Sequence, residues 1–259
     1  MKSKKASVLA IGTEITTGQI VNKNSSWISR QLRKYNVLTD IHLTVPDDRD
    51  LIQWALNQVQ VKSDWIFVTG GLGPTSDDLT REMISLWAKR QPVWDEESWL
   101  QLRDRLRSRG REVKDIHKSQ CYFPEGARIL KNAQGTAHGF HLSVYNKEVF
   151  IFPGPPNELE SCWQNDMETW LLKETKGLPQ YLTYSWDTQG VGESDVALMV
   201  MSVLPKEHHV EVGYRVHPPY VEVKLSYYER YKDEGDLIYQ KMDQVLSSIT
   251  VRRAIWPKE

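Results

Sequence analysis

The stretch that decides the fold is "TGGLGPTSDDLT", residues 69–80. It follows the apolar run 65–68, which has the composition of a buried strand, and apolar residues then recur at helical spacing from Leu79 to Trp87. A simple turn from strand to helix needs one glycine and one capping residue. This turn has three glycines, a proline and two adjacent aspartates. The stretch therefore predicts a strand end that accommodates a ligand.

The rest of the N-terminal part alternates between strand and helix patterns. We expect strands at 8–11, 37–45 and 65–68, and helices at 22–35, 51–59, 79–87 and 99–106. Such alternation is typical of βαβ units, with a parallel sheet covered by helices on both faces. A hairpin of strands 140–145 and 149–152 and a helix over 159–170 complete a first domain, which we place at residues 1–175.

A second, smaller domain is predicted for residues 178–259, after a linker at 176–179. The expected elements are, in order, strand 181–188, helix 193–204, strands 209–216 and 220–227, helix 235–249 and strand 249–256. This βαββαβ order is the split-βαβ pattern of small α+β domains.

Composition limits the classes of function. The formal net charge of −1 over 259 residues argues against a protein that coats nucleic acid. No apolar run is long enough to span a membrane. Only two cysteines are present, so no disulfide framework is indicated. We therefore expect a cytoplasmic protein that has neither nucleic acid nor membrane as a partner.

The glycine tract has the composition of a phosphate site. In open parallel sheets ligands bind beyond the carboxyl ends of the strands, where this tract lies. Gly70, Gly71 and Gly73 let the backbone approach a ligand and turn amides toward an anion. The hydroxyls of Thr75 and Ser76 are expected to donate to phosphate oxygens. No Gly-Lys-Ser/Thr follows, so the tract is not a Walker loop.

Two aspartates in the same tract indicate a metal. Asp77 and Asp78 would repel a bare phosphate, and a divalent cation, Mg²⁺ or similar, between carboxylate and phosphate removes the conflict. Gly12-Thr13-Glu14 ends the first strand and could place a third carboxylate at the same sheet edge. The simpler alternatives are that Asp78 only caps the following helix and that Glu14 is a solvated loop residue.

Five stretches together resemble the N-terminal domain of the CinA (competence- and damage-inducible) family, over about residues 6–172. They are "GTEITTGQIVNKNS", "TGGLGPTSDDLT", "RGREV", "FPEGARILKNAQGTAHGF" and "FPGPPNEL". "GVGES" at 190–194 resembles the start of that family's small second domain. The resemblance implies a doubly wound, three-layer α/β/α domain of the molybdopterin-binding MoaB and MogA type, often dimeric. It also implies metal-dependent cleavage of the ADP-ribose pyrophosphate.

The motif matches and the chemistry of the individual residues together give the expected site. As catalytic residues we expect Asp77, Asp78 and Glu14, with Asp77 and Asp78 as metal ligands. The expected substrate-binding residues are Gly12, Thr13, Gly70, Gly71, Gly73, Thr75, Ser76, Arg109, Arg111, Thr136, His138 and Gly154.

The two arginines in this set lie in a run of five at alternate positions from 103 to 111. Residues two apart do not share a helical face, so the run is not one basic stripe. Arg109 and Arg111 follow the expected helix and lie in the motif "RGREV", and we expect them to bind substrate phosphate.

The chain departs from the family pattern in three ways. Many members continue into an amidase that deamidates nicotinamide mononucleotide; we expect no such activity here, and a separately encoded amidase would be a partner. Residues 116–120 read "IHKSQ" where the family tends to read Asn-Asn-Arg-Lys-Gln. His138 replaces a proline, and we expect its ring near the ligand edge, where it would bind phosphate more strongly when protonated. The alternative is that His138 is a tolerated loop substitution.

The sequence thus predicts a homodimeric, metal-dependent hydrolase of nucleoside diphosphate-type substrates, most specifically an ADP-ribose pyrophosphatase. Two alternatives stay open. One is a molybdenum-cofactor protein that binds or adenylylates a pterin, and the other is a nucleotide-sensing module without catalysis.

Overall fold

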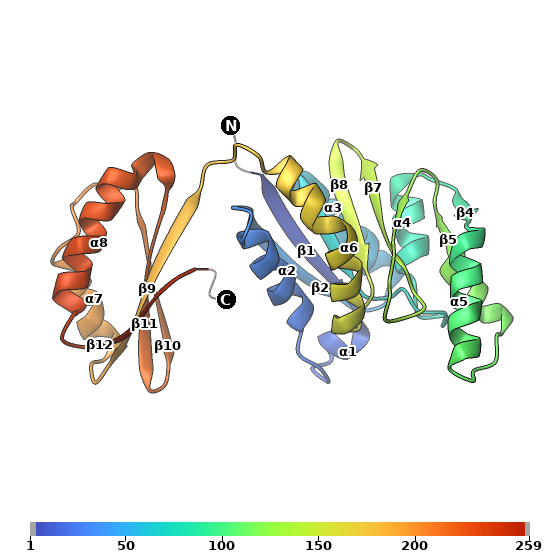
Figure 1. Ribbon diagram of the computed structural model, residues 1–259, viewed down its shortest axis with the longest axis horizontal. Helices are drawn as coiled ribbons and strands as arrows, with labels where there is room; N and C mark the ends of the chain where they lie inside the picture. The colour runs from blue at the N-terminus through green and yellow to red at the C-terminus, as the bar shows by residue number, and fades with distance from the viewer. Residues whose placement is uncertain (1–3, 257–259) are drawn as a thin grey trace. The chain divides into compact units, whose positions relative to one another are not determined.

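The computed structural model describes residues 4–256, apart from the side chains of residues 165 and 166. The chain divides into two compact units, which meet in sequence at Lys176 and Gly177 (Figure 1). Each unit has its own hydrophobic core. No helix in the described range is both long enough and apolar enough to cross a membrane.

The first unit is built on a six-stranded mixed sheet of order β2-β1-β3-β8-β7-β6. Its strands are β1 (Lys5–Ile11), β2 (Leu38–Val45), β3 (Trp65–Thr69), β6 (Arg128–Leu130), β7 (Gly139–Val144) and β8 (Lys147–Phe152). The first four strands in this order pair in parallel, whereas β7 and β6 are antiparallel additions at one edge. The predicted β7–β8 hairpin is confirmed, and it brings the end of β8 beside the end of β3.

Helices cover both faces of this sheet. The helices are α2 (Lys23–Arg33), α3 (Arg49–Lys62), α4 (Thr80–Ala88) and α6 (Pro156–Glu174). Along β3, Ile66 and Val68 join the core formed with α3 and α4. Phe67 points to the opposite face, where its ring lies 5.9 Å from that of Trp163 on α6. The predicted three-layer α/β/α architecture is therefore confirmed.

Short elements surround this framework, and the sequence did not predict them. They are α1 (Thr13–Thr16), β4 (Pro92–Trp94), the 3-10 helix η1 (Asp115–Cys121) and β5 (Tyr122–Pro124). Strands β4 and β5 pair with each other, and α5 (Glu96–Ser108) packs Leu102 and Leu106 against Cys121. Elements this short carry too few residues to show a hydrophobic period.

The second unit is an antiparallel sheet of order β10-β11-β9-β12 with two helices on one face. Its elements are β9 (Tyr181–Gln189), α7 (Glu193–Met201), β10 (Glu211–His217), β11 (Tyr220–Tyr228), the short η2 (Glu229–Tyr231), α8 (Lys232–Leu246) and β12 (Thr250–Ile255). Strand β11 lies between β9 and β10, which is the predicted split-βαβ arrangement.

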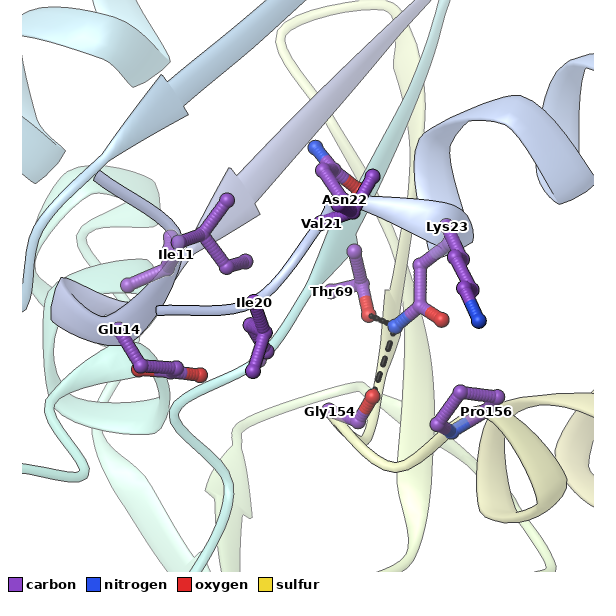
Figure 2. Close-up of a pocket in the computed structure, with 12 residues that line it drawn as sticks. Ile11, Glu14, Ile20, Val21, Asn22, Lys23, Thr69, Gly154 and Pro156 are labelled. Carbon is purple, nitrogen blue, oxygen red and sulfur yellow. Dashed lines mark hydrogen bonds between the residues drawn. The ribbon is translucent and has the colours of Figure 1, made fainter. Parts of the chain in front are cut away.

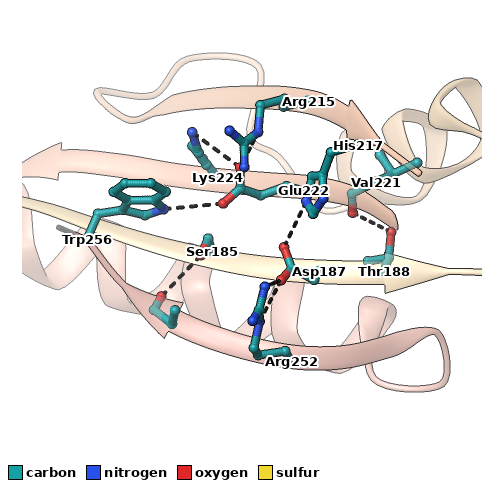
Figure 3. A network of polar contacts seen from close by, with 11 residues as sticks. Ser185, Asp187, Thr188, Arg215, His217, Val221, Glu222, Lys224, Arg252 and Trp256 are labelled. Carbon is teal, nitrogen blue, oxygen red and sulfur yellow. Dashed lines mark hydrogen bonds and ion pairs between the residues drawn. The ribbon is translucent and has the colours of Figure 1, made fainter. Parts of the chain in front are cut away.

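The other face of that sheet holds two buried carboxylates (Figure 3). Asp187 and Glu222 follow the core residues Trp186 and Val221 and are 2% and 0% exposed. Arg252 donates to Asp187, and the Nε of Arg215 lies 2.9 Å from Glu222. Buried carboxylates need such partners, so these ion pairs are part of the structure of the sheet.

Candidate functional site

Two adjoining cavities lie at the carboxyl ends of β1, β3 and β8. One, of about 420 Å³, is shown in Figure 2, and the other, of about 530 Å³, lies on the side of the glycine tract. Residues Glu14, Ile20, Gly70, Gly154 and Pro156 line both cavities. The larger cavity contains seven of the predicted site residues: Glu14, Gly70, Gly71, Gly73, Asp78, Thr136 and Gly154. The sheet edge predicted from the sequence therefore does hold a concave site.

The glycine tract can lie this close to its neighbours because it lacks side chains. Gly70 has φ +103°, and a Cβ at this position would lie 2.0 Å from the carbonyl oxygen of Ile11 at the end of β1. A Cβ on Gly135, next in sequence to the cavity residue Thr136, would lie 1.9 Å from the carboxylate of Glu158. The absence of side chains at both positions thus makes room for neighbouring strand ends and for the carboxylate.

Asp78 organises the tract from within. Its Oδ1 accepts a hydrogen bond from the amide of Gly73 at 2.7 Å, and its Oδ2 accepts from the amide and the hydroxyl of Thr75 at 2.9 and 2.5 Å. These amides and this hydroxyl, expected to face a phosphate, bind a carboxylate of the chain itself. Asp78 thus closes the loop as well as lining the cavity.

Asp77 and Ser76 are exposed and are not among the residues that line the cavities. Of the two predicted metal ligands, only Asp78 lines the cavity, and Asp77 lies beside it in sequence on the solvent side.

Glu14 reaches the site from helix α1. The amide and hydroxyl of Thr13 both donate to Asp47, at 2.8 and 2.9 Å, and the amide of Asp47 donates back to the Thr13 hydroxyl. The amide of Gly12 donates to Val45, which fixes the same loop to the end of β2. Gly12 and Thr13 therefore hold Glu14 in place and do not line either cavity.

The opposite wall of the larger cavity is formed by the loop before β7. The side-chain amide of Asn132 donates to the carbonyl of Ala137 at 2.8 Å and to Glu158 at 2.7 Å. Its oxygen accepts from the amides of Gln134 and Gly135. Asn132 thus ties the loop to helix α6 and positions Thr136 and Glu158 at the cavity.

The expectation for His138 was wrong. The side chain is 5% exposed, lies outside both cavity linings, and accepts a hydrogen bond at Nδ1 from the amide of Asn132. Burial, helped by the nearby Arg105 and Arg81, lowers the pKa of His138 to about 4. The ring is therefore neutral in the ordinary pH range and serves as an interior acceptor, because a buried imidazole is costly to charge.

The expected arginines also lie elsewhere. Arg109 is exposed and donates to the carbonyl of Gln134 at 2.8 Å, and Arg105 donates to the carbonyl of Gly135. Both brace the outer side of the 132–137 loop. Arg111 is exposed, and neither it nor Arg109 lines either cavity. Arg105 is half-buried, whereas Arg109 and Arg111 are exposed.

Three polar residues of the site did not emerge from the sequence. The side-chain amide of Asn24 donates to the Thr69 hydroxyl at 2.9 Å and to the Gly154 carbonyl at 2.7 Å, and the two dashed lines in Figure 2 end on the labelled Thr69 and Gly154. It thereby joins helix α2 to the ends of β3 and β8. Arg81 and Gln120 both donate to the carbonyl of Leu72, at 2.6 and 3.3 Å. Asn24 lies in the quoted motif "GTEITTGQIVNKNS", but Arg81 and Gln120 have no local signal.

The fold and the site together place the chain in a known class of protein, the molybdopterin-binding domains. The profile of the family described as "Probable molybdopterin binding domain" matches residues 7–173, and the chain belongs to this family. Within that class it belongs to the CinA family. It is 31% identical to a crystal structure titled as the protein CinA with unknown function from Thermoplasma acidophilum, with a TM-score of 0.60. The match covers 65% of this chain and 99% of that one.

Longer relatives carry the same family name. A competence-damage inducible protein of Desulforamulus reducens is 34% identical over 222 residues, covering 86% of this chain and 54% of that protein. One of Bacillus mycoides is 28% identical over 241 residues, covering 93% of this chain and 58% of that protein. The chain thus spans little more than half the length of these relatives.

Proposed function

We propose that the protein is a metal-dependent hydrolase of nucleoside diphosphate-type substrates, and most specifically an ADP-ribose pyrophosphatase. The observation that supports this most is the larger cavity, which combines a glycine-rich backbone with the carboxylates of Glu14, Asp78 and Glu158. A close backbone approach suits a phosphate group, and adjacent carboxylates suit the cation that accompanies it.

The residues fit a divalent cation of the kind that shares its ligands with a substrate. Among the described residues no cluster of three or more His, Cys, Asp or Glu side chains forms a complete metal site. Magnesium needs no such cluster, since it binds through one or two carboxylates plus substrate phosphates. Asp78 would hold the ion, with Asp77 beside it and Glu14 across the cavity. When bound, the ion would neutralise diphosphate charge and acidify a coordinated water.

The chain's own groups would supply orientation and a base. In the proposed reaction water adds to one phosphorus, the bridging P–O bond breaks, and AMP and ribose 5-phosphate form as dianions with release of two protons. Glu14, which is exposed at the cavity and held through Thr13 and Asp47, is the candidate general base. The smaller cavity, lined by Ile11, Ile15 and Val21, offers an apolar wall for a flat base.

The proposal is tested by incubating the protein with ADP-ribose and with Mg²⁺, Mn²⁺ or Co²⁺ in turn, and separating the products by chromatography. AMP and ribose 5-phosphate should form only when a divalent ion is present. The Glu14→Gln variant should bind ADP-ribose with similar affinity and turn it over at least about 100-fold more slowly. Equal turnover by this variant would remove Glu14 from the catalytic set.

A second candidate is a role in molybdopterin chemistry, and the family description favours it. The same cavities would then bind a pterin and a nucleotide. A fluorescent pterin that copurifies with the protein, or adenylylation of added molybdopterin, would support this function over hydrolysis.

A non-catalytic sensing role is the third candidate. It is favoured by the engagement of both Asp78 oxygens within the tract. Saturable ADP-ribose binding without turnover at any metal would select it.

We also propose that the protein works as a homodimer. Sedimentation velocity at micromolar concentrations tests this directly. A species with the mass of a dimer is expected, and a monomer would contradict the proposal.

A further inference from the structure

Gln120 presents a buried hydrogen-bond acceptor that the chain does not use. The residue is 2% exposed and lines the larger cavity. Its Nε2 donates to the Leu72 carbonyl at 3.3 Å, whereas its Oε1 has no hydrogen-bond partner among the residues that the structure describes. The amide cannot be reversed, because that would place Oε1 against the carbonyl oxygen of Leu72. A buried acceptor without a partner costs about 1–3 kcal/mol, so its retention beside a cavity points to a ligand.

Arg81 fixes the environment of this acceptor. Its guanidinium is buried and donates to the same Leu72 carbonyl, and to that of His138 at 3.4 Å. No ion pair joins it to a carboxylate in the described part of the chain. Burial lowers its pKa only to about 10, so it stays positive at neutral pH. A buried cation thus lies behind the glycine tract, where it interacts with the Asp78 carboxylate and makes this wall of the cavity more favourable for negative charge.

The other residues that line the larger cavity limit which chemical groups that ligand can carry. Glu14, Asp78 and Glu158 are acceptors, so a diphosphate alone would meet carboxylates unless a cation lies between them. Gln120 is neutral and neither attracts that cation strongly nor repels the phosphate. Its Oε1 suits an O–H donor carried by the ligand close to its phosphates. The sugar hydroxyls of a ribosyl diphosphate are such donors, and inorganic diphosphate has none when ionised.

We propose that Gln120 is a specificity residue, whose Oε1 accepts a hydrogen bond from a ribose hydroxyl beside the diphosphate. This inference rests on the proposed function and adds to it how the site distinguishes ribosyl diphosphates from bare diphosphate. The Leu72 carbonyl keeps its bond from Arg81 when Gln120 is replaced, so an apolar replacement leaves no carbonyl unpaired.

The test is binding of ADP-ribose and of inorganic diphosphate, each with Mg²⁺, by titration calorimetry. Gln120→Met should weaken ADP-ribose binding about tenfold and leave diphosphate binding within about twofold. The matched control is Gln53→Met, because Gln53 donates to Asn57 on helix α3 and lines neither cavity, and both ligands should bind to this variant as to wild type. Equal weakening of both ligands by Gln120→Met, or no weakening of either, would overturn the proposal.

Failure of the proposed function would look different, because the wild-type protein itself would then bind neither ligand, or would bind ADP-ribose without turning it over. If Gln120→Met and Gln120→Leu both unfold below the assay temperature, their binding cannot be compared with that of wild type. A crystal structure of the wild-type protein with ADP-ribose then tests the proposal. A ribose hydroxyl within about 3.2 Å of Oε1 supports the proposal, and a separation beyond about 4 Å overturns it.

Discussion

Replacing Asp78 by asparagine should separate the structural role of this residue from that of its neighbour. The carboxylate accepts three hydrogen bonds, from the amide of Gly73 and from the amide and hydroxyl of Thr75. Asparagine keeps one acceptor oxygen and places an NH₂ group where the other oxygen was. The bond from Gly73 can persist, the Thr75 hydroxyl can reverse, and the Thr75 amide loses its acceptor. Hydrogen bonds to charged groups contribute about 1.5–3 kcal/mol each, so Asp78→Asn should destabilise the first unit by about 2 kcal/mol.

For a unit of this size that loss lowers the unfolding midpoint by roughly 4–8 °C, measured by circular dichroism. Asp77→Asn is the matched control, because its side chain is exposed and closes no loop. It should unfold close to the wild-type temperature while turnover falls, whereas Asp78→Asn should lose both stability and turnover. Equal midpoints for the two variants would refute the view that Asp78 holds the tract together.

Three further predictions concern the same edge of the sheet. His138 has its pKa lowered to about 4 from 6.5 by burial, so the unfolded chain binds a proton in this interval and the folded one does not. Stability should therefore fall as pH drops from about 6.5 to about 4, by about 3 kcal/mol from this residue, and urea titrations of His138→Leu should show a shallower dependence. A slope equal to that of wild type would contradict the assignment. Asn24→Ala removes the donors to Thr69 and Gly154 and should cost about 2 kcal/mol, with weaker ADP-ribose binding by calorimetry. Unchanged affinity would show that the Gly154 turn does not contact ligand. Gly70→Ala places a Cβ against the Ile11 carbonyl and should yield little soluble protein, or protein destabilised by more than about 3 kcal/mol; near-wild-type stability would contradict the described backbone.

The long elements of the fold were predictable because their apolar residues keep a period over many positions. The pattern of 51–59 corresponds to α3, Arg49–Lys62, and that of 220–227 to β11, Tyr220–Tyr228. The location of the two cavities was also predictable, since strand ends in a parallel sheet meet at one edge. What periodicity cannot supply is the course of short segments such as η1, which carries Gln120 to the cavity.

The direction in which individual side chains point was the second feature that the sequence could not predict. His138 lies between Ala137 and Gly139 in a loop, and loop position alone favoured exposure. The structure turns its ring inward because the amide of Asn132, six residues earlier, needs an acceptor there. Arg81 is a second case. A charged residue in the first turns of a helix reads as solvated, yet the carbonyls of Leu72 and His138 provide it with buried partners.

The most direct test of the central proposal is a ³¹P NMR time course of ADP-ribose with the wild-type protein and Mg²⁺ or Mn²⁺. The proposed chemistry predicts that the diphosphate resonances disappear while two phosphomonoester resonances, those of AMP and ribose 5-phosphate, grow in equal amounts. Chelation of the metal should stop the conversion, and the Glu14→Gln variant should slow it at least about 100-fold. The contrary result is that the diphosphate resonances persist with every divalent ion tested, at a protein concentration high enough to bind all of the ADP-ribose. That result would contradict hydrolysis as the function of this site.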